Sequence, residues 1–177
     1  CMILNSRTLK TVLGYGLSLI EKITGVSFKK NNLTSIFNYL HISFNITTSG
    51  QPTRQQLDAI QSNGYKKIIN LAPPIAENSL ANEADLVADS GMDYINIPVD
   101  FSHPTEADFE QFVLHMQNQD SQKIWVHCAA NMRVSCFIFK YRTAILGENL
   151  IDAEADLKKI WQPNKTWQDF IDKPKSV

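Results

Sequence analysis

The chain has 177 residues, enough for one domain with a sizeable core, and its 44% hydrophobic and 20% charged residues are typical of a globular protein. The net charge is −1, with a basic first 30 residues and a weakly acidic remainder, which argues against a nucleic-acid partner. No stretch reaches the roughly 18 consecutive apolar residues that a membrane-spanning helix needs.

The three cysteines, Cys1, Cys128 and Cys136, are too few and too scattered for a disulfide framework. They suit a reducing compartment, so we expect a cytoplasmic protein. The alternative is an exported form that carries a lipid on Cys1, the first residue of the sequence. His41 and His115 have no partner at metal-ligand spacing, so we expect neither a metal nor a cofactor.

Residues 7–24 predict a helix with one apolar stripe, formed by Leu9, Val12, Leu13, Leu17, Ile20 and Ile23. We favour a helix that packs on the body of the protein over contact with a membrane surface, the alternative for a basic amphipathic helix. Residues 1–40 are therefore interpreted as an N-terminal helical extension and residues 41–177 as the main domain.

After residue 41, short apolar segments alternate with helical patterns. Strands are expected within residues 42–50, 66–72, 93–99 and 123–126, and helices within residues 53–64, 82–91, 105–117, 134–146, 152–161 and 166–172. This order predicts an α/β fold with a central, mainly parallel sheet of four or five strands flanked by helices.

Two of these helices carry clear start signals. Thr53 is expected to cap the first helix, which ends before Gly64. Thr105 and Asp108 form a capping-box-like start for the third helix. The inner face of that third helix is expected to consist of Phe109, Phe112, Val113 and Met116.

The segment KIWVHCAANMRVS, residues 123–135, contains a cysteine directly after an apolar strand and just before a helix. The N–H groups of such a loop and the helix N-terminus attract anions and lower the pKa of a thiol. Cys128 is therefore either a thiolate nucleophile that faces a bound phosphate or a buried cysteine that packs as a small hydrophobe. Spacing alone leaves both interpretations open.

The stretch VHCAANMRVS resembles the signature loop of the protein tyrosine phosphatases, in their dual-specificity-like bacterial branch. That loop reads His-Cys, two residues, Gly, two residues, Arg, then Ser or Thr. Two further segments resemble the same family: TTSGQPTRQQLDAIQSNGYKKIINL at residues 47–71, and YINIPVD at residues 94–100. The resemblance covers about residues 42–172 and implies a cysteine phosphatase-like fold.

The loop departs from the family pattern at two positions. Asn131 replaces the glycine, a mild change because asparagine tolerates a left-handed backbone. Val134 stands at the arginine position, and the arginine is one residue earlier, at Arg133. One step along a helix turns a side chain by about 100°. Either Arg133 points away and Val134 faces the anion, or the loop tightens by one residue and Arg133 contacts the anion.

The resemblance implies roles for individual residues. Cys128 would be the nucleophile, His127 would orient the loop and lower the pKa of the thiol, and Ser135 would hydrogen-bond the thiolate. Asp100 would protonate the leaving oxygen. Arg133 would clamp the phosphate oxygens if the loop tightens. The phosphate cradle would be formed by the backbone of Ala129, Ala130, Asn131, Met132 and Arg133.

Each role has a structural alternative. His127 would also fit a core position, Ser135 the first turn of a helix, and Asp100 a turn after a strand. His103 is an alternative acid. Cys136 fits the core better than the role of a thiol that forms a disulfide with an oxidised Cys128.

The expected function is hydrolysis of phosphate monoesters through a phosphocysteine intermediate, with a phosphorylated protein or a small phosphate monoester as the substrate. One alternative is a weak or inactive phosphate-binding relative, suggested by the displaced arginine. The other is a rhodanese-like sulfurtransferase, because four residues separate Cys128 from Arg133.

Overall fold

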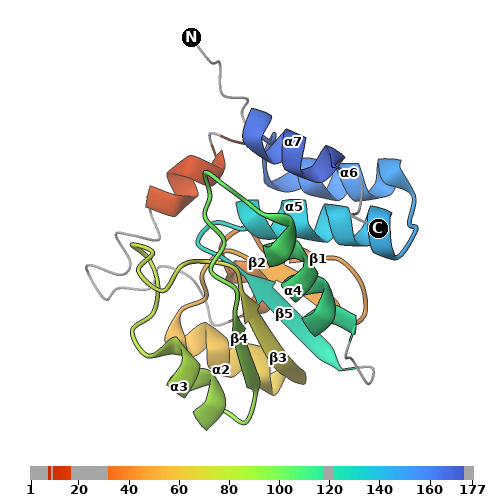
Figure 1. Cartoon of the computed structure of the whole chain (residues 1–177). Helices are drawn as coiled ribbons and strands as arrows, with labels where there is room; N and C mark the ends of the chain where they lie inside the picture. Colours follow the sequence, from red (N-terminus) through yellow and green to blue (C-terminus); the bar gives the residue numbers. More distant parts are fainter. Residues whose placement is uncertain (1–7, 9, 17–31, 118–121, 174–177) are drawn as a thin grey trace.

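The computed structural model describes residues 8, 10–16, 32–117 and 122–173, and its centre is a five-stranded sheet (Figure 1). The strands lie in the order β1-β2-β5-β3-β4, and every neighbouring pair is parallel except β1 with β2. This confirms the predicted α/β class and the mainly parallel sheet. Only the short edge strand β1 was not predicted. The strands are β1 (Leu40–His41), β2 (Ile46–Ser49), β3 (Tyr65–Asn70), β4 (Asp93–Asn96) and β5 (Lys123–His127).

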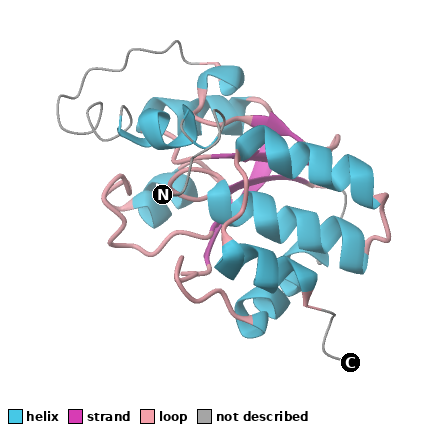
Figure 2. Cartoon of the chain, turned by 90° about the horizontal axis from the view of Figure 1, so that it is seen from above, coloured by secondary structure: helices cyan, strands magenta, loops and turns pink. Residues whose placement is uncertain are grey.

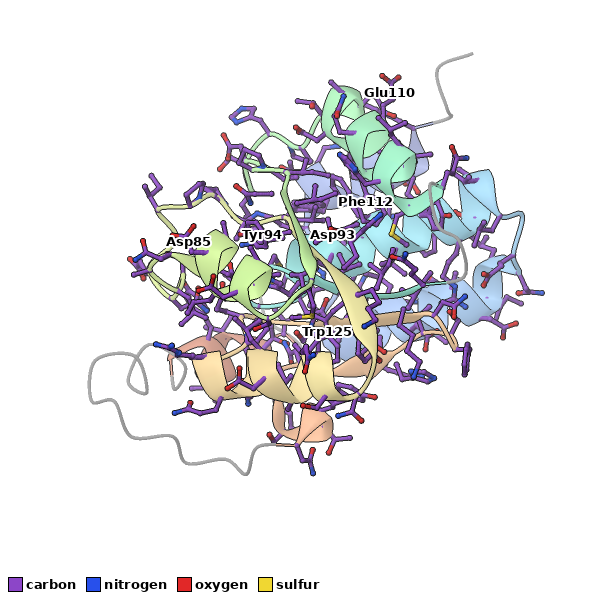
Figure 3. All side chains as sticks on the ribbon, turned by 90° about the horizontal axis from the view of Figure 1, so that it is seen from below. Asp85, Asp93, Tyr94, Glu110, Phe112 and Trp125 are labelled. Carbon is purple, nitrogen blue, oxygen red and sulfur yellow. The ribbon has the colours of Figure 1, made fainter. Side chains whose placement is uncertain are left out.

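Helices cover both faces of the sheet (Figure 2). They are α2 (Arg54–Ser62), α3 (Glu83–Asp89), α4 (Glu106–Gln117), α5 (Met132–Lys140), α6 (Leu150–Ile160) and α7 (Lys165–Asp172), with a π-helical turn at Tyr141–Ile145 and a 3₁₀ turn at Leu33–Ser35. Helices α2 and α3 pack on one face around Trp125, and α4 to α7 pack on the other around Phe112 (Figure 3).

The predicted helix starts are confirmed. Thr53 and Gln56 form a capping box at the start of α2, and the helix ends before Gly64, whose φ is 84°. Thr105 and Asp108 exchange hydrogen bonds at the start of α4: the Thr105 N–H donates to Asp108 Oδ2 at 3.0 Å, and the Asp108 N–H donates to Thr105 Oγ1 at 3.1 Å. The four residues predicted for the inner face of α4 are buried.

Helix α5 runs through the middle of the larger cluster, between the sheet and helices α6 and α7. Residues 134–140 are all buried, as its nearly uniform apolar sequence predicted. The one charged residue among them, Lys140, donates to Glu106 Oε1 at 2.6 Å and to the Phe170 carbonyl at 3.0 Å. The helix that follows the cysteine loop is therefore held on all sides.

The N-terminal helical residues 10–16 pack on the body through polar and small residues. Thr11 Oγ1 donates to the Ile160 carbonyl at 2.6 Å, and Gly14 lies against the Phe37 ring. Val12 and Leu13 are 47% and 60% exposed. Packing on the body is thus confirmed for this part, whereas the predicted apolar contact face is wrong at these two residues, because a hydrogen-bonding threonine and a glycine make the close contacts. Residues 17–24 of the predicted helix lie outside the described residues.

Over the residues that the structure describes, no helix combines the length and apolar character that would be needed to cross a bilayer.

The aromatic centre of the larger cluster gives a stability prediction. The Phe137 ring lies 5.1–6.2 Å, centroid to centroid, from the rings of Phe109, Phe112, Trp167 and Phe170. We expect Phe137→Ala to lower the free energy of unfolding by about 3–5 kcal/mol, because it opens a cavity in a closely packed region. Urea denaturation measures the change. Leu114→Ala, at a half-exposed position on α4, is the control and should stay within about 0.5 kcal/mol.

Candidate active site

The carboxyl ends of β2, β3 and β5 meet where Cys128 begins its loop, because His127 is in register with Ser49 on one neighbour and Asn70 on the other. Crevices at this edge of a parallel sheet are the usual ligand sites of open α/β folds. Cys128 follows β5 directly, and α5 begins four residues later at Met132. Its side chain is fully buried from solvent yet lines a cavity.

Hydrogen bonds from distant segments fix the carbonyl groups of the loop. The Ala129 carbonyl accepts from the Gln51 N–H at 3.2 Å and from Asn78 Nδ2 at 2.9 Å. The Ala130 carbonyl accepts from Asn38 Nδ2 at 3.0 Å. In a trans peptide the C=O and the next N–H point in opposite directions. The N–H group of Ala130 is therefore turned away from Gln51 and Asn78, as a backbone anion cradle requires.

Asn131 takes the position of the family's glycine and adopts the left-handed conformation, with φ at 63°. This confirms the interpretation of that substitution. Its side chain adds contacts that glycine lacks, because Nδ2 donates to the Asn38 carbonyl at 2.7 Å and to Thr48 Oγ1 at 3.0 Å. The asparagine thus completes the turn and also ties the loop to β2 and to Asn38.

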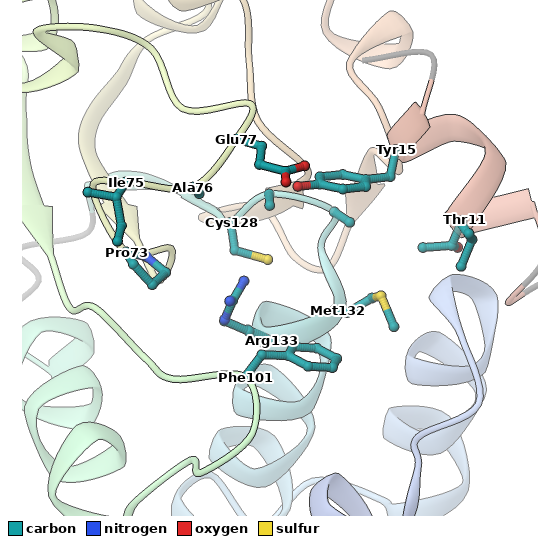
Figure 4. A pocket seen from close by; sticks show the side chains of 13 residues that line it. Thr11, Tyr15, Pro73, Ile75, Ala76, Glu77, Phe101, Cys128, Met132 and Arg133 are labelled. Atoms are coloured by element: carbon teal, nitrogen blue, oxygen red, sulfur yellow. The ribbon is translucent and has the colours of Figure 1, made fainter. Parts of the chain in front are cut away.

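Arg133 lines the same cavity as Cys128. Its Nε donates to the Val99 carbonyl at 2.9 Å, and its guanidinium lies 5.3 Å from the centre of the Phe101 ring. Figure 4 shows this guanidinium pointing toward the Cys128 sulfur. Val134 is fully buried in the core and does not line the cavity. Of the two arrangements that the sequence left open, this placement of Arg133 and Val134 is the one expected of a tightened loop, and contact of Arg133 with an anion stays a prediction.

His127 lies behind the loop and belongs to a buried polar network around Glu83. Its Nε2 is 3.2 Å from Glu83 Oε1, an ion-pair distance at which the angle does not suit a hydrogen bond. Glu83 also accepts hydrogen bonds from Gln51 Nε2 at 2.6 Å, Asn70 Nδ2 at 2.9 Å and the Tyr94 hydroxyl at 3.1 Å. The network connects α3, β3 and β4 with the residue that precedes the nucleophile candidate.

Burial opposes ionisation of Glu83, but the nearby His127 and the donated hydrogen bonds outweigh it and lower the pKa of this carboxyl. Burial, together with Glu83, raises the pKa of Tyr94, which keeps its hydroxyl as a donor. The sequence did not identify Glu83 as part of the site. Acidic residues are common in the first turn of any helix, so its position gave no sign of a contact with His127.

Asp100 lies on the surface and does not line the cavity. Its Oδ1 accepts from the Ser102 N–H at 2.8 Å, and its Oδ2 is 3.6 Å from His103 Nδ1. The Ser102 hydrogen bond, and to a smaller extent His103 and Arg133, lowers the pKa of Asp100. Its neighbour Phe101 is the residue of this loop that reaches the cavity.

Ser135 and Cys136 face the core behind the loop. Ser135 Oγ donates to the Met132 carbonyl at 2.9 Å and accepts from Trp161 Nε1 at 3.1 Å. These bonds correspond to the alternative in which this serine stabilises the first helical turn. Cys136 is fully buried, and burial raises the pKa of its thiol well above the usual value.

The cavity has a volume of about 430 Å³, within the range of small-molecule sites. Its floor is the cysteine loop, and its walls come from residues 73–77, from Phe101 and from the N-terminal helical residues 11–15. Arg133 and Glu77 are the charged side chains that line it among the described residues. Over the described residues, no group of three or more His, Cys, Asp or Glu side chains is placed to hold a metal ion.

A parallel α/β sheet that presents a cysteine, a backbone cradle and an arginine at one loop defines the class of domains that resemble tyrosine and dual-specificity phosphatases. The chain belongs to the family described as the DSP-PTPase phosphatase fused to NAD+ kinase, whose model matches residues 20–169. The comparison with curated proteins gave no match.

Solved structures with the same fold include a DUF442 protein from Shewanella putrefaciens CN-32 described as a candidate phosphatase. It is 29% identical, with 79% of this chain and 92% of that chain covered and a TM-score of 0.71. Two more distant structures show the fold alone. P. aeruginosa TpbA, solved with phosphotyrosine, is 12% identical over 78% of this chain and 85% of that chain, with a TM-score of 0.62. The PP-IP phosphatase SIW14 from S. cerevisiae, solved with citrate, is 17% identical over 78% and 86%, with a TM-score of 0.67.

The network around Glu83 gives a pH-dependent prediction. The folded protein lowers the pKa of Glu83, so its stabilising effect is present above the usual value of 4.5 and is lost as the pH falls through the lower folded value. We expect Glu83→Gln to lower the free energy of unfolding by about 1–3 kcal/mol at neutral pH, with a smaller difference below pH 4.5. Urea denaturation between pH 3 and pH 7, roughly the window set by carboxyl titration, measures both values.

The control is Glu110→Gln, on the solvent side of α4 (Figure 3), which should change stability little at any pH. A difference between Glu83→Gln and the unsubstituted protein that stays constant down to the lowest pH would contradict the proposed ionised state of this carboxyl.

Proposed function

We propose that the protein is a cysteine-dependent phosphatase that hydrolyses phosphate monoesters through a phosphocysteine on Cys128. The observation that carries the proposal is that Cys128 and Arg133 line one cavity. The carbonyls of Ala129 and Ala130, in the loop that forms its floor, accept hydrogen bonds from side chains of other segments. Membership of a phosphatase family supports the reaction class. The TpbA complex with phosphotyrosine supports a phosphorylated protein as substrate, and a small phosphate monoester is the other candidate.

In the first step, the Cys128 thiolate attacks phosphorus and the bond from phosphorus to the ester oxygen breaks. The backbone N–H groups of residues 129–133 hold the phosphoryl oxygens, and the terminal nitrogens of Arg133 bind two of them. The hydrogen bond that Arg133 makes to the Val99 carbonyl uses Nε, so the proposal assigns its terminal nitrogens, which lie toward the Cys128 sulfur in Figure 4, to the phosphoryl oxygens. The charge that develops on the phosphoryl group is thereby stabilised.

The leaving oxygen takes its proton from an acid, and Asp100 is the proposed donor. In the second step, the same carboxylate takes a proton from water as the water attacks phosphorus. The bond from phosphorus to sulfur breaks, which regenerates the thiolate and releases inorganic phosphate. In the structure Asp100 lies on the surface, outside the cavity. To reach the leaving oxygen, the loop that carries Asp100 would have to close over the ligand before the first step.

His127 and Ser135 are proposed to position the loop. His127, held near Glu83, fixes the end of β5 from which Cys128 extends. Ser135 links the first turn of α5 to Trp161. To bond the thiolate, Ser135 Oγ would exchange its hydrogen bond to the Met132 carbonyl for one to Cys128.

The alternative of a sulfurtransferase is favoured by one observation, the four residues between Cys128 and Arg133. A cavity of about 430 Å³ with an aromatic and apolar lining suits the organic part of an ester better than the transfer of one sulfur atom. The alternative of an inactive phosphate-binding relative was suggested by the displaced arginine, and the position of Arg133 in the cavity supports the active enzyme over it.

Substitution of the nucleophile and of the arginine tests the proposal with an aryl phosphate. Cys128→Ser should abolish turnover but keep phosphate binding, because the cradle is backbone. Arg133→Lys should lower kcat roughly a hundredfold, since a lysine cannot form the two-pronged contact. The control Arg54→Lys, on the exposed surface of α2, should leave kinetics unchanged.

Mass spectrometry of rapidly quenched protein should detect phosphate on Cys128. A persulfide on Cys128 after incubation with thiosulfate, without any phosphocysteine, would instead identify a sulfurtransferase. Phosphate binding without turnover in the unsubstituted protein would identify the inactive relative.

The pH dependence of turnover tests Asp100. The acid acts only when protonated, and its pKa lies below the usual value of 3.8 in the free protein, so the protonated fraction falls as the pH rises above that value. We expect kcat for an ester with a poor leaving group to rise as the pH falls from neutral toward 5. Asp100→Asn should lower kcat by roughly 10²–10⁴-fold and flatten this dependence. His103→Gln is the comparison, and a flattened profile in that variant alone would assign the acid to His103.

A further inference from the structure

The N-terminal helical residues supply one wall of the candidate active site although they precede the matched family segment, which begins at residue 20. Thr11, Val12 and Tyr15 line the cavity together with Cys128 and Arg133. Figure 4 shows the Tyr15 ring extending across the cavity above Cys128, with its hydroxyl beside the Glu77 carboxylate. The family fold thus provides the loop, and a segment outside it completes the pocket.

This wall is tied directly to the cysteine loop. Asn38 Nδ2 donates both to Thr11 Oγ1 at 3.2 Å and to the Ala130 carbonyl at 3.0 Å, and Thr11 Oγ1 donates in turn to the Ile160 carbonyl at 2.6 Å. Gly14 packs so closely on Phe37 that an added Cβ would lie 2.2 Å from the ring. These contacts place the wall against the loop rather than leaving it as a loose cover.

The lining is mainly apolar and carries little charge. Val12, Ile75, Phe101 and Met132 surround the space above the thiol, and Val12 and Ile75 are exposed at its rim. Arg133 is the single cationic lining residue among the described residues, and the Glu77 carboxylate lines the same cavity on the side of Tyr15 (Figure 4). One arginine suffices for one phosphate group, whereas a second anionic group on the substrate would meet a carboxylate and an apolar wall.

We propose that residues 10–16 form a substrate-selecting wall, with Tyr15 as its specificity-determining residue, and that the pocket selects phosphate monoesters of uncharged, apolar alcohols over esters that carry further anionic groups. This rests on the proposed function in one respect, that the phosphate occupies the Cys128 loop. Tyr15 contacts the alcohol part of the ester, and Glu77 at the rim repels a second charged group.

The test is a set of binding measurements by calorimetry with full-length Cys128→Ser protein, so that no turnover occurs. The ligands are 1-naphthyl phosphate, inorganic phosphate and fructose 1,6-bisphosphate. We expect naphthyl phosphate to bind more tightly than the bisphosphate. Adding Tyr15→Ser should weaken naphthyl phosphate binding about tenfold, the scale of one contact between rings, and leave inorganic phosphate unchanged.

Two further variants sharpen the result. Leu13→Ser alters an exposed apolar residue of the same helix that does not line the cavity, and it should change no binding constant. Glu77→Gln should tighten binding of the bisphosphate severalfold and affect naphthyl phosphate less. The denaturation midpoint of each variant checks that the fold is intact.

The inference is overturned if Tyr15→Ser leaves naphthyl phosphate binding unchanged, or if the bisphosphate binds as tightly as naphthyl phosphate. Equal weakening of naphthyl phosphate and inorganic phosphate would also overturn it, because the helix would then support the loop rather than select the ester. Turnover by the unsubstituted protein is a separate measurement. Tyr15-dependent binding without turnover would uphold the wall and reject the phosphatase reaction.

Discussion

The outward hydrogen bonds of the Ala129 and Ala130 carbonyls are the constraint on which the candidate site depends. A backbone cradle can bind an anion only when its N–H groups face the ligand, and the carbonyls must then find partners elsewhere, because buried carbonyls without partners are costly. Here the partners are Gln51, Asn78 and Asn38, from three separate segments. The cysteine loop is therefore shaped by the whole domain rather than by its own sequence.

The rigid surroundings of α5 support this loop from the other side. Every residue from 134 to 140 is buried, and Lys140 is neutralised by Glu106 within the core. Arg133 is the second residue of α5, so the packing of this helix fixes the direction of its side chain. The next residue, Val134, is buried in the core. Asn131 takes the left-handed conformation in the loop, and residues 134–140 of the helix stay buried.

The sequence predicted the helices and strands well, because helix caps and buried faces depend on residues that are close together in the chain. The caps at Thr53 and Thr105 and the buried face of α4 depend on residues three or four apart. The direction of Arg133 could not be predicted, since it depends on how the loop closes. Asn38 and Asn78 were missed because they act on residues more than 50 positions away, and nothing in their local sequence distinguishes them from ordinary loop asparagines.

Because a single amide group, Asn38 Nδ2, serves both Thr11 and the Ala130 carbonyl, the N-terminal helix and the anion cradle share one donor. Two sites that share a structural element are linked thermodynamically, and the linkage is reciprocal. If docking of the helix strengthens phosphate binding by some factor, phosphate must strengthen docking of the helix by the same factor. The docking of residues 10–16 would then depend on the occupancy of the cradle, and a partner that captured these residues would change the affinity of a site that it never touches.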